Sequence, residues 1–308
     1  MGNLVLKVST NTIKEMKEYY QKSLKSPSPP YTAFSAKVGS CTITAYQSGK
    51  VMFQGSGAEV EASKWGKVEP SQAKASTASA SLPKGFEGWS VIGSDEVGTG
   101  DYFGPLTVVA AYVPKDKLAL VKELGVKDSK DLKDPQIITI AKELIHVIPY
   151  SLLVLPNDKY NEIQAKGYSQ GKIKALLHNR ALRNVLQKIS PVKPEAILID
   201  QFAEKNIYYR HIQTEKEIVR ENVYFSTKAE GLHLSVAAAS IIARYAFLKH
   251  WDELSEKAGI ILPKGASNKV DEAAAKLIRK HGEEALWRYA KVHFANTQKA
   301  KNLLYKKR

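Results

Sequence analysis

The chain has a single cysteine, Cys41, among 308 residues. One cysteine excludes an internal disulfide and any zinc finger built on cysteine pairs. A lone thiol is typical of a reducing compartment, so we expect a cytoplasmic protein. No apolar run approaches the roughly 18 residues that a spanning helix needs, and the N-terminus lacks the apolar core of a signal peptide. A membrane association is therefore not expected.

Acidic residues are scarce relative to basic ones. The 31 Asp and Glu face 46 Lys and Arg, which gives a formal net charge of +15 and an isoelectric point near 9.5. Such an excess favours a polyanionic partner, either nucleic acid or an anionic membrane surface. Because nothing indicates membrane insertion, nucleic acid is the stronger expectation. A merely soluble basic protein is the alternative on composition alone.

A break in composition divides the chain. Residues 69–86 include a stretch rich in Ser, Ala and Thr between two prolines, which is typical of a flexible linker. The break predicts a small α+β domain over residues 1–68 and a larger domain over residues 87–308. The small domain is expected in βαβββα order. It carries no acidic cluster and has little room for a catalytic core, so we expect it to bind rather than catalyse.

The larger domain alternates between strand and helix patterns. This mixture predicts an α/β fold, a sheet with helices packed on its faces. Strands are expected near residues 89–94, 106–113, 151–155, 196–201 and 222–226. Helices are expected near residues 117–124, 135–147, 170–189, 234–258, 271–281, 284–294 and 297–305.

Two adjacent carboxylates, Asp95 and Glu96, follow the apolar strand pattern and precede a glycine-rich turn. Successive side chains in a strand point to opposite faces, so both acids serve one site only if the strand ends or distorts there. Glycines allow that distortion. A buried acidic pair is costly unless something compensates it, and a divalent cation is the usual compensation. The segment therefore indicates a metal site.

Two further carboxylates have similar settings. Asp200 ends the apolar run 196–200, and Glu230 precedes the small-residue helix pattern 235–244. Taken singly, each is explained as well by a solvated strand end or a helix cap. Four carboxylates at strand or helix ends of one domain can instead hold two hard cations that activate a water at a phosphate. Spacing alone does not establish that the four converge.

At these residues the chain resembles the type 2 ribonucleases H, and within them the ribonuclease HIII subfamily. The N-terminal region resembles that subfamily's TATA-binding-protein-like substrate-binding domain. The resemblance implies a ribonuclease H-like catalytic domain that cleaves the RNA strand of RNA/DNA hybrids with Mg²⁺ or Mn²⁺, leaving 5′-phosphate and 3′-hydroxyl ends. We expect a monomer. The motifs that match are Gly93–Pro105, Val126–Lys130, Ile199–Phe202, Thr227–Gly231 and Ala237–Arg244.

The resemblance also implies roles for single residues. The sister subfamily, ribonuclease HII, has Asp where this chain has Glu230 and a Gly-Arg-Gly turn where it has Gly98–Thr99–Gly100, so both positions favour HIII. Two alternatives are an HII-like enzyme that incises at single ribonucleotides in duplex DNA and a non-catalytic nucleic-acid-binding protein. The family's catalytic, metal-binding quartet falls on Asp95, Glu96, Asp200 and Glu230.

Substrate contacts are predicted in the catalytic domain. The turn Gly98, Thr99 and Gly100 is a candidate for 2′-hydroxyl contact, because glycine backbone approaches a sugar closely. A purely structural turn is equally compatible with it. Ser129 and Lys130 are candidates for phosphate binding, and a helix cap explains them equally well.

In the N-terminal domain, a polar hairpin is a second candidate surface for nucleic acid. A solvated hairpin tip is the simpler interpretation. The candidate residues are Tyr46, Gln47, Lys50 and Gln54. His178, His233 and His293 lie in or beside apolar helical patterns, so we interpret them as core or capping residues rather than general bases.

Overall fold

The computed structural model describes residues 3–26, 32–47, 49–66 and 82–305. The chain divides into two compact units, Met1–Ala78 and Ser79–Arg308. The predicted linker, residues 69–86, lies outside the described residues as far as residue 81. Its last residue, Phe86, is buried and begins a short 3₁₀ helix, Phe86–Gly88.

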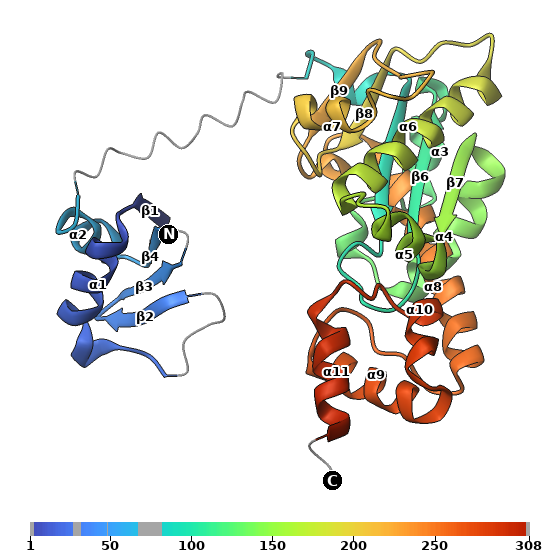
Figure 1. Cartoon of the computed structure of the whole chain (residues 1–308). Coiled ribbons are helices and arrows are strands. Elements are labelled where there is room, and N and C mark those ends of the chain that lie inside the picture. The colour runs from blue at the N-terminus through green and yellow to red at the C-terminus, as the bar shows by residue number, and fades with distance from the viewer. Residues whose placement is uncertain (1–2, 27–31, 48, 67–81, 306–308) are drawn as a thin grey trace. The chain divides into compact units, whose positions relative to one another are not determined.

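The N-terminal unit is a four-stranded antiparallel sheet with two helices on one face (Figure 1). The sheet order is β1-β4-β3-β2, and the βαβββα order agrees with the prediction. Met16, Ile43 and Phe53 are among the residues buried between helices and sheet. The elements are β1 (Asn3–Lys7), α1 (Thr10–Tyr19), β2 (Thr32–Val38), β3 (Cys41–Tyr46), β4 (Lys50–Gln54) and α2 (Ala58–Ser63).

The larger unit is built on a five-stranded mixed sheet of order β7-β6-β5-β8-β9. β6 pairs antiparallel with β5 and β7, whereas β8 pairs parallel with β5 and β9. The predicted α/β class with a mixed sheet is confirmed. The strands are β5 (Val91–Val97), β6 (Leu106–Val113), β7 (Tyr150–Leu155), β8 (Ala196–Asp200) and β9 (Val223–Ser226).

Helices cover both faces of this sheet (Figure 1). On β6, Val108 and Ala110 pack with α6 (Gln170–Ile189), while Val109 and Ala111 pack with α8 (Leu234–Ala258), as the alternation of strand side chains requires. α8 packs so closely against β5 that a Cβ on Gly93 would lie 2.2 Å from the Val236 backbone nitrogen. α4 (Asp134–Val147) and α3 (Leu118–Glu123) complete the α8 side.

A group of C-terminal helices packs around the residues that follow β5. Tyr102 and Phe103 are buried in this cluster together with Trp251 of α8. The predicted helix 284–294 is wrong beyond Tyr289, because the Lys291 N–H donates to the Tyr102 carbonyl and extends the chain there. The helices are α9 (Asn268–His281), α10 (Leu286–Tyr289) and α11 (Ala295–Tyr305).

Two helices were not predicted, α5 (Asn157–Ala165) and α7 (Lys205–His211). Within the described part of the chain, none of the helices combines the length and the apolar character needed to cross a bilayer.

Candidate active site

The two adjacent acids lie inside strand β5. The predicted strand end at residue 94 is wrong, because β6 continues to pair beyond it, Asp95 with Val109 and Glu96 with Val108. Pairing with β8 stops at Ser94. At the position of the acids, β5 is therefore hydrogen-bonded to β6 on one edge and has no strand partner from β8 on the other edge. The carboxylates gain access to one site from this open side without the distortion that we expected.

Strand register brings the second aspartate beside the first. β5 and β8 run parallel, and Ser94 pairs with Ile199, so Asp95 and Asp200 follow at the next position. An Asp200 oxygen accepts a hydrogen bond from the Ala229 N–H at 2.8 Å, which fixes the short 3₁₀ helix that carries Glu230. All four predicted carboxylates line one cavity of about 530 Å³.

Negative charge in this cavity is incompletely compensated at the two aspartates. Burial raises the pKa of Asp95 well above its usual value, and repulsion from Glu96 and Asp200 adds to this effect. Burial also raises the pKa of Asp200, against the opposing effect of the Ala229 N–H. Both aspartates would gain from a nearby cation.

Glu96 is compensated by two side chains of α6. Lys174 Nζ donates to Glu96 Oε1 at 2.7 Å, and His178 Nε2 lies 2.9 Å from Glu96 Oε2. Burial alone would raise the pKa of Glu96, but these two partners outweigh it and lower the pKa. Neither residue was predicted at the site. The available signal was a lysine and a histidine four residues apart in a helix whose other buried residues, apart from Asn179, are apolar.

Glu230 is held by the two residues that we predicted to bind phosphate. The Ser129 N–H and hydroxyl donate to Glu230 Oε2 at 2.9 and 2.6 Å, and Lys130 Nζ donates to Oε1 at 2.9 Å. Burial opposes these contacts, yet together they lower the pKa of Glu230. Lys133 is the N-cap of α4 and Asp128 is the cap of the short 3₁₀ helix at this point, so the helix-cap interpretation of Ser129 is wrong.

The donor set fits a hard divalent cation, which prefers carboxylate oxygens. Among the described residues, no three acidic, histidine or cysteine side chains lie close enough together to coordinate one metal ion. The contacts explain why. Glu96 and Glu230 form ion pairs with lysines, and the negative charges of the other carboxylates repel that of Asp95. A bound cation would remove the repulsion and give the four carboxylates a common partner.

The glycine turn after β5 borders the same cavity. Gly98 has φ +98°, and a Cβ there would lie 2.2 Å from the Pro105 carbonyl oxygen, so this position requires glycine. Gln170 Nε2 donates to the Thr99 carbonyl at 3.0 Å and ties the turn to α6. The Thr99 hydroxyl is buried and has no hydrogen-bond partner among the described residues.

The hairpin candidates of the N-terminal unit belong to its open sheet face. Register places Lys50 of β4 opposite Lys7 of β1, and Tyr46 and Gln54 lie on the same side of the sheet. Gln47 lies in the turn, and Ser48 within it lies outside the described residues. Two like charges directly opposite each other in a ladder are destabilising, so Lys7 and Lys50 form an electropositive, mutually repelling pair on this face.

The three histidines have different settings. His178 is fully buried, as interpreted, but its ring also touches Glu96. His233 caps α8, since its Nδ1 accepts from the Ser235 N–H at 3.0 Å. His293 stacks on Tyr160, away from the four carboxylates.

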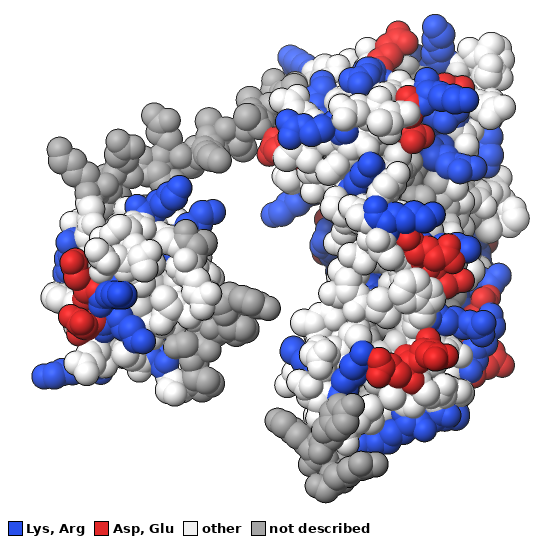
Figure 2. All heavy atoms as spheres, viewed as in Figure 1, with Lys and Arg blue, Asp and Glu red and all other residues white. Residues whose placement is uncertain are grey.

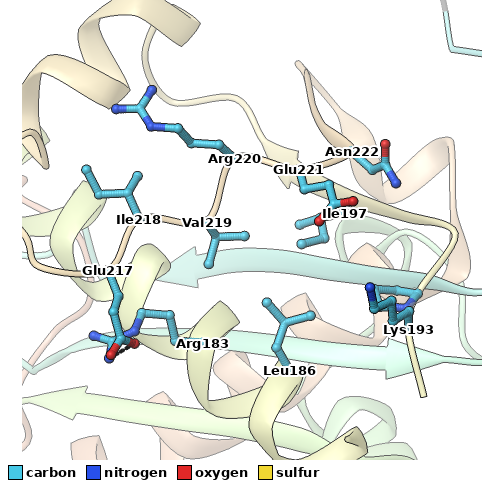
Figure 3. Close-up of a pocket in the computed structure, with 11 residues that line it drawn as sticks. Arg183, Leu186, Lys193, Ile197, Glu217, Ile218, Val219, Arg220, Glu221 and Asn222 are labelled. Carbon is cyan, nitrogen blue, oxygen red and sulfur yellow. Dashed lines mark ion pairs between the residues drawn. The ribbon is translucent and has the colours of Figure 1, made fainter. Parts of the chain in front are cut away.

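A further cavity, of about 560 Å³, lies at the other end of β8 (Figure 3). Leu186, Ile197 and Val219 form its apolar lining, and Arg183 pairs with Glu217 at one side. It lacks the converging carboxylates of the first cavity, so it does not qualify as the catalytic centre.

Comparison with known proteins shows which family the chain is similar to. Residues 92–297 match the family model of ribonuclease HII, and residues 3–78 match a domain family of unknown function (DUF3378). The chain is 60% identical to ribonuclease HIII of Bacillus subtilis (strain 168) over 313 residues, which cover 100% of both chains. It is 61% identical to ribonuclease HIII of Bacillus pumilus (strain SAFR-032), covering 99% of this chain and 100% of the relative.

The chain belongs to the ribonuclease HIII family. It is a ribonuclease H, an endoribonuclease that hydrolyses phosphodiester bonds. The crystal structure of Bst-RNase HIII in complex with Mn²⁺ is similar over 100% of both chains, with 45% identity and a TM-score of 0.70. The ribonuclease H2 of Pyrococcus horikoshii OT3 shares the fold, with 23% identity, a TM-score of 0.58 and coverage of 70% of this chain and 99% of that one.

Proposed function

We propose that the enzyme cleaves the RNA strand of RNA/DNA hybrids by two-metal-ion hydrolysis with Mg²⁺ or Mn²⁺, leaving 5′-phosphate and 3′-hydroxyl ends. The convergence of Asp95, Glu96, Asp200 and Glu230 on one cavity carries this proposal. The similarity to Bst-RNase HIII, whose structure contains Mn²⁺, supports the choice of cations. The raised pKa values of the two aspartates supply the electrostatic reason for a cation at this place.

Each carboxylate has a distinct part in the proposed site. Asp95 and Asp200 are the central ligands, since they are adjacent in register and the described lysines of the site pair with Glu96 and Glu230 instead. Glu96 and Glu230 complete the site or order the attacking water. Bound divalent ions supply an activated water and stabilise the leaving oxygen.

Two segments beside the four carboxylates would contact the substrate. The Gly98–Thr99–Gly100 turn, which borders the cavity of the four carboxylates, contacts 2′-hydroxyls through its backbone. Lys130 and Ser129 bind a phosphate. The Lys130 side chain is 70% exposed although its ammonium reaches Glu230, so one group faces both the cavity and the solvent.

The N-terminal unit anchors the hybrid through its open sheet face. Tyr46, Gln47, Lys50 and Gln54 contribute to this face, and Lys7 strengthens its charge. The space-filling view shows Lys and Arg side chains on the visible face of each unit (Figure 2). Such side chains bind the phosphates of a nucleic acid without regard to its sequence. We propose a substrate-binding domain over residues 1–68, a flexible linker over residues 69–86 and a catalytic domain over residues 87–308, working as a cytoplasmic monomer.

A cleavage assay on matched labelled substrates tests the function. The substrates are a long RNA/DNA hybrid, a DNA duplex with one ribonucleotide and the same duplex without it, each with Mn²⁺ or with a chelator. We expect metal-dependent cleavage of the hybrid, weak incision at the single ribonucleotide and none of the DNA. Preference for the single ribonucleotide would establish the HII-like alternative. Binding without any turnover would establish the non-catalytic one.

A further inference from the structure

Two side chains of α6 grip the Glu96 carboxylate, one at each oxygen. Lys174 and His178 lie four residues apart and so project from the same side of the helix. Their side chains are 10% and 0% exposed, and Glu96 is 11% exposed. An ionised carboxylate only accepts hydrogen bonds, so His178 Nε2 carries the donated proton. Both oxygens of Glu96 therefore have a fixed donor.

The same two residues reach the end of the neighbouring strand. Phe202 lies two residues beyond Asp200, and its ring packs 5.0 Å from the His178 ring. Lys174 Nζ lies 4.2 Å from the centroid of the same phenyl ring. On its other side, His178 Nδ1 hydrogen bonds with the Ser94 hydroxyl at 2.6 Å. The pair thus connects the strand of Glu96 with the segment that follows Asp200.

A buried lysine is an unfavourable choice for packing alone. An ammonium taken out of water loses several kcal/mol of hydration, and an apolar side chain of similar volume fills such a place as well or better. Its presence is explained if the orientation of Glu96 matters more than stability. Residues that orient a ligand have this character in metal sites, and replacing them typically lowers metal affinity or activity 10- to 100-fold.

We propose that Lys174 and His178 are positioning residues, which fix the orientation of the Glu96 carboxylate and its placement relative to the strand end that bears Asp200. The proposal rests on the hybrid-cleaving function proposed above. It assigns opposite effects to Lys174. Its hydrogen bond orients Glu96 for the reaction, while its positive charge competes with a divalent cation for the same carboxylate.

The substitution Lys174→Met separates these two effects, with Lys188→Met as a control on the same helix. Lys188 lies near the end of α6, where its ammonium contacts the Tyr150 carbonyl and not the active site. We expect Lys174→Met to lower kcat on the hybrid about 10- to 100-fold at saturating Mn²⁺. Calorimetric titration without substrate should show Mn²⁺ binding at least as tight as in the wild type. Lys188→Met should match the wild type in both measurements.

Two substitutions of His178 form a second, independent test. A glutamine amide can take the place of Nε2, so His178→Gln keeps a donor for Glu96 and loses the Ser94 contact. An asparagine amide can take the place of Nδ1, so His178→Asn keeps the Ser94 contact and loses Glu96. We expect His178→Gln to retain several times more kcat than His178→Asn, at equal hybrid affinity.

The outcomes are distinguishable from failure of the proposed function. If the wild type does not cleave the hybrid, the function itself is wrong. If the wild type cleaves and Lys174→Met stays within twofold of it, the positioning role is wrong. The role is also wrong if Lys174→Met loses kcat, hybrid affinity and Mn²⁺ affinity together, or if both His178 variants lose kcat equally, since general loss of packing predicts these results.

Discussion

The Asp95 carboxylate accepts a hydrogen bond from the Glu96 backbone N–H at 2.7 Å. The Glu96 carboxylate instead accepts hydrogen bonds from Lys174 and His178 of α6. The two acids are adjacent in sequence, yet within the described part of the chain only Glu96 has a cationic partner at hydrogen-bond distance. Asp95 carries uncompensated charge in a buried place, and its pKa is raised accordingly. This asymmetry makes Asp95 the carboxylate with most to gain from a divalent ion.

Replacing Asp95 should therefore stabilise the metal-free protein. A raised pKa means that the folded state binds the proton more tightly, so the ionised form lowers stability once the pH exceeds the unfolded value near 4. We expect Asp95→Asn to raise the free energy of unfolding at pH 7 by about 1–3 kcal/mol, measured by urea denaturation with a chelator. Saturating Mn²⁺ should raise the melting temperature of the wild type more than that of the variant.

The exposed substitution Asp116→Asn serves as a control, since this residue lies in a solvent-facing 3₁₀ turn. It should change neither quantity. A less stable Asp95→Asn protein, or equal Mn²⁺ stabilisation in both proteins, would contradict the electrostatic account.

The close contact between β5 and α8 gives a prediction about glycines. Gly93→Ala places a Cβ 2.2 Å from the Val236 backbone nitrogen, so we expect a loss of about 1–3 kcal/mol or more in urea denaturation. Gly100→Ala meets no described atom within 4 Å and should leave stability within about 0.5 kcal/mol. The same Gly100 variant should bind the hybrid less tightly. Unchanged affinity would remove the turn from the substrate contacts.

His233 predicts a stability change on the acid side of neutrality. Burial lowers the pKa of His233 to about 4, against the opposing bond to the Trp89 carbonyl. The unfolded chain binds this proton from about pH 6.5 downward and the folded protein does not, so stability falls between pH 6.5 and 4 by on the order of 3 kcal/mol. His233→Asn keeps a good capping residue and should flatten this part of the stability curve. An unchanged slope would refute the assignment.

The open sheet face of the N-terminal unit predicts a change in salt dependence. Lys50→Gln removes the repulsion with Lys7 and should stabilise the protein by a few tenths of a kcal/mol. It should also weaken hybrid binding and reduce the slope of log Kd against log salt by about one. Lys17→Gln, an exposed change on α1, is the matched control and should leave the slope unchanged. Equal effects of both substitutions would indicate general charge rather than this face.

Regular apolar patterns made much of the fold predictable. The bounds of α6 and α8 agree with the prediction because their buried residues recur at helical spacing. α5 was missed because its buried face carries Asn157 and Asn161, which donate to carbonyls of residues 289, 287 and 290. Partners more than 120 residues away leave no local pattern.

The site was predictable only in part for the same reason. Carboxylates at strand and helix ends pointed to one edge of the sheet, and parallel register explains why Asp95 and Asp200 meet there. The partners of these acids depend on how α6 is rotated against β5. Glu96 and His178 are 82 residues apart, so their contact could not be foreseen from spacing.

The most direct test compares the wild type with Asp95→Asn on a labelled RNA/DNA hybrid at saturating Mn²⁺, with hybrid affinity measured in parallel. We expect metal-dependent cleavage by the wild type, loss of cleavage by at least about a thousandfold in the variant, and hybrid affinities within about a factor of three. Asp95→Asn cleaving the hybrid at the wild-type rate would contradict the central place given to this carboxylate.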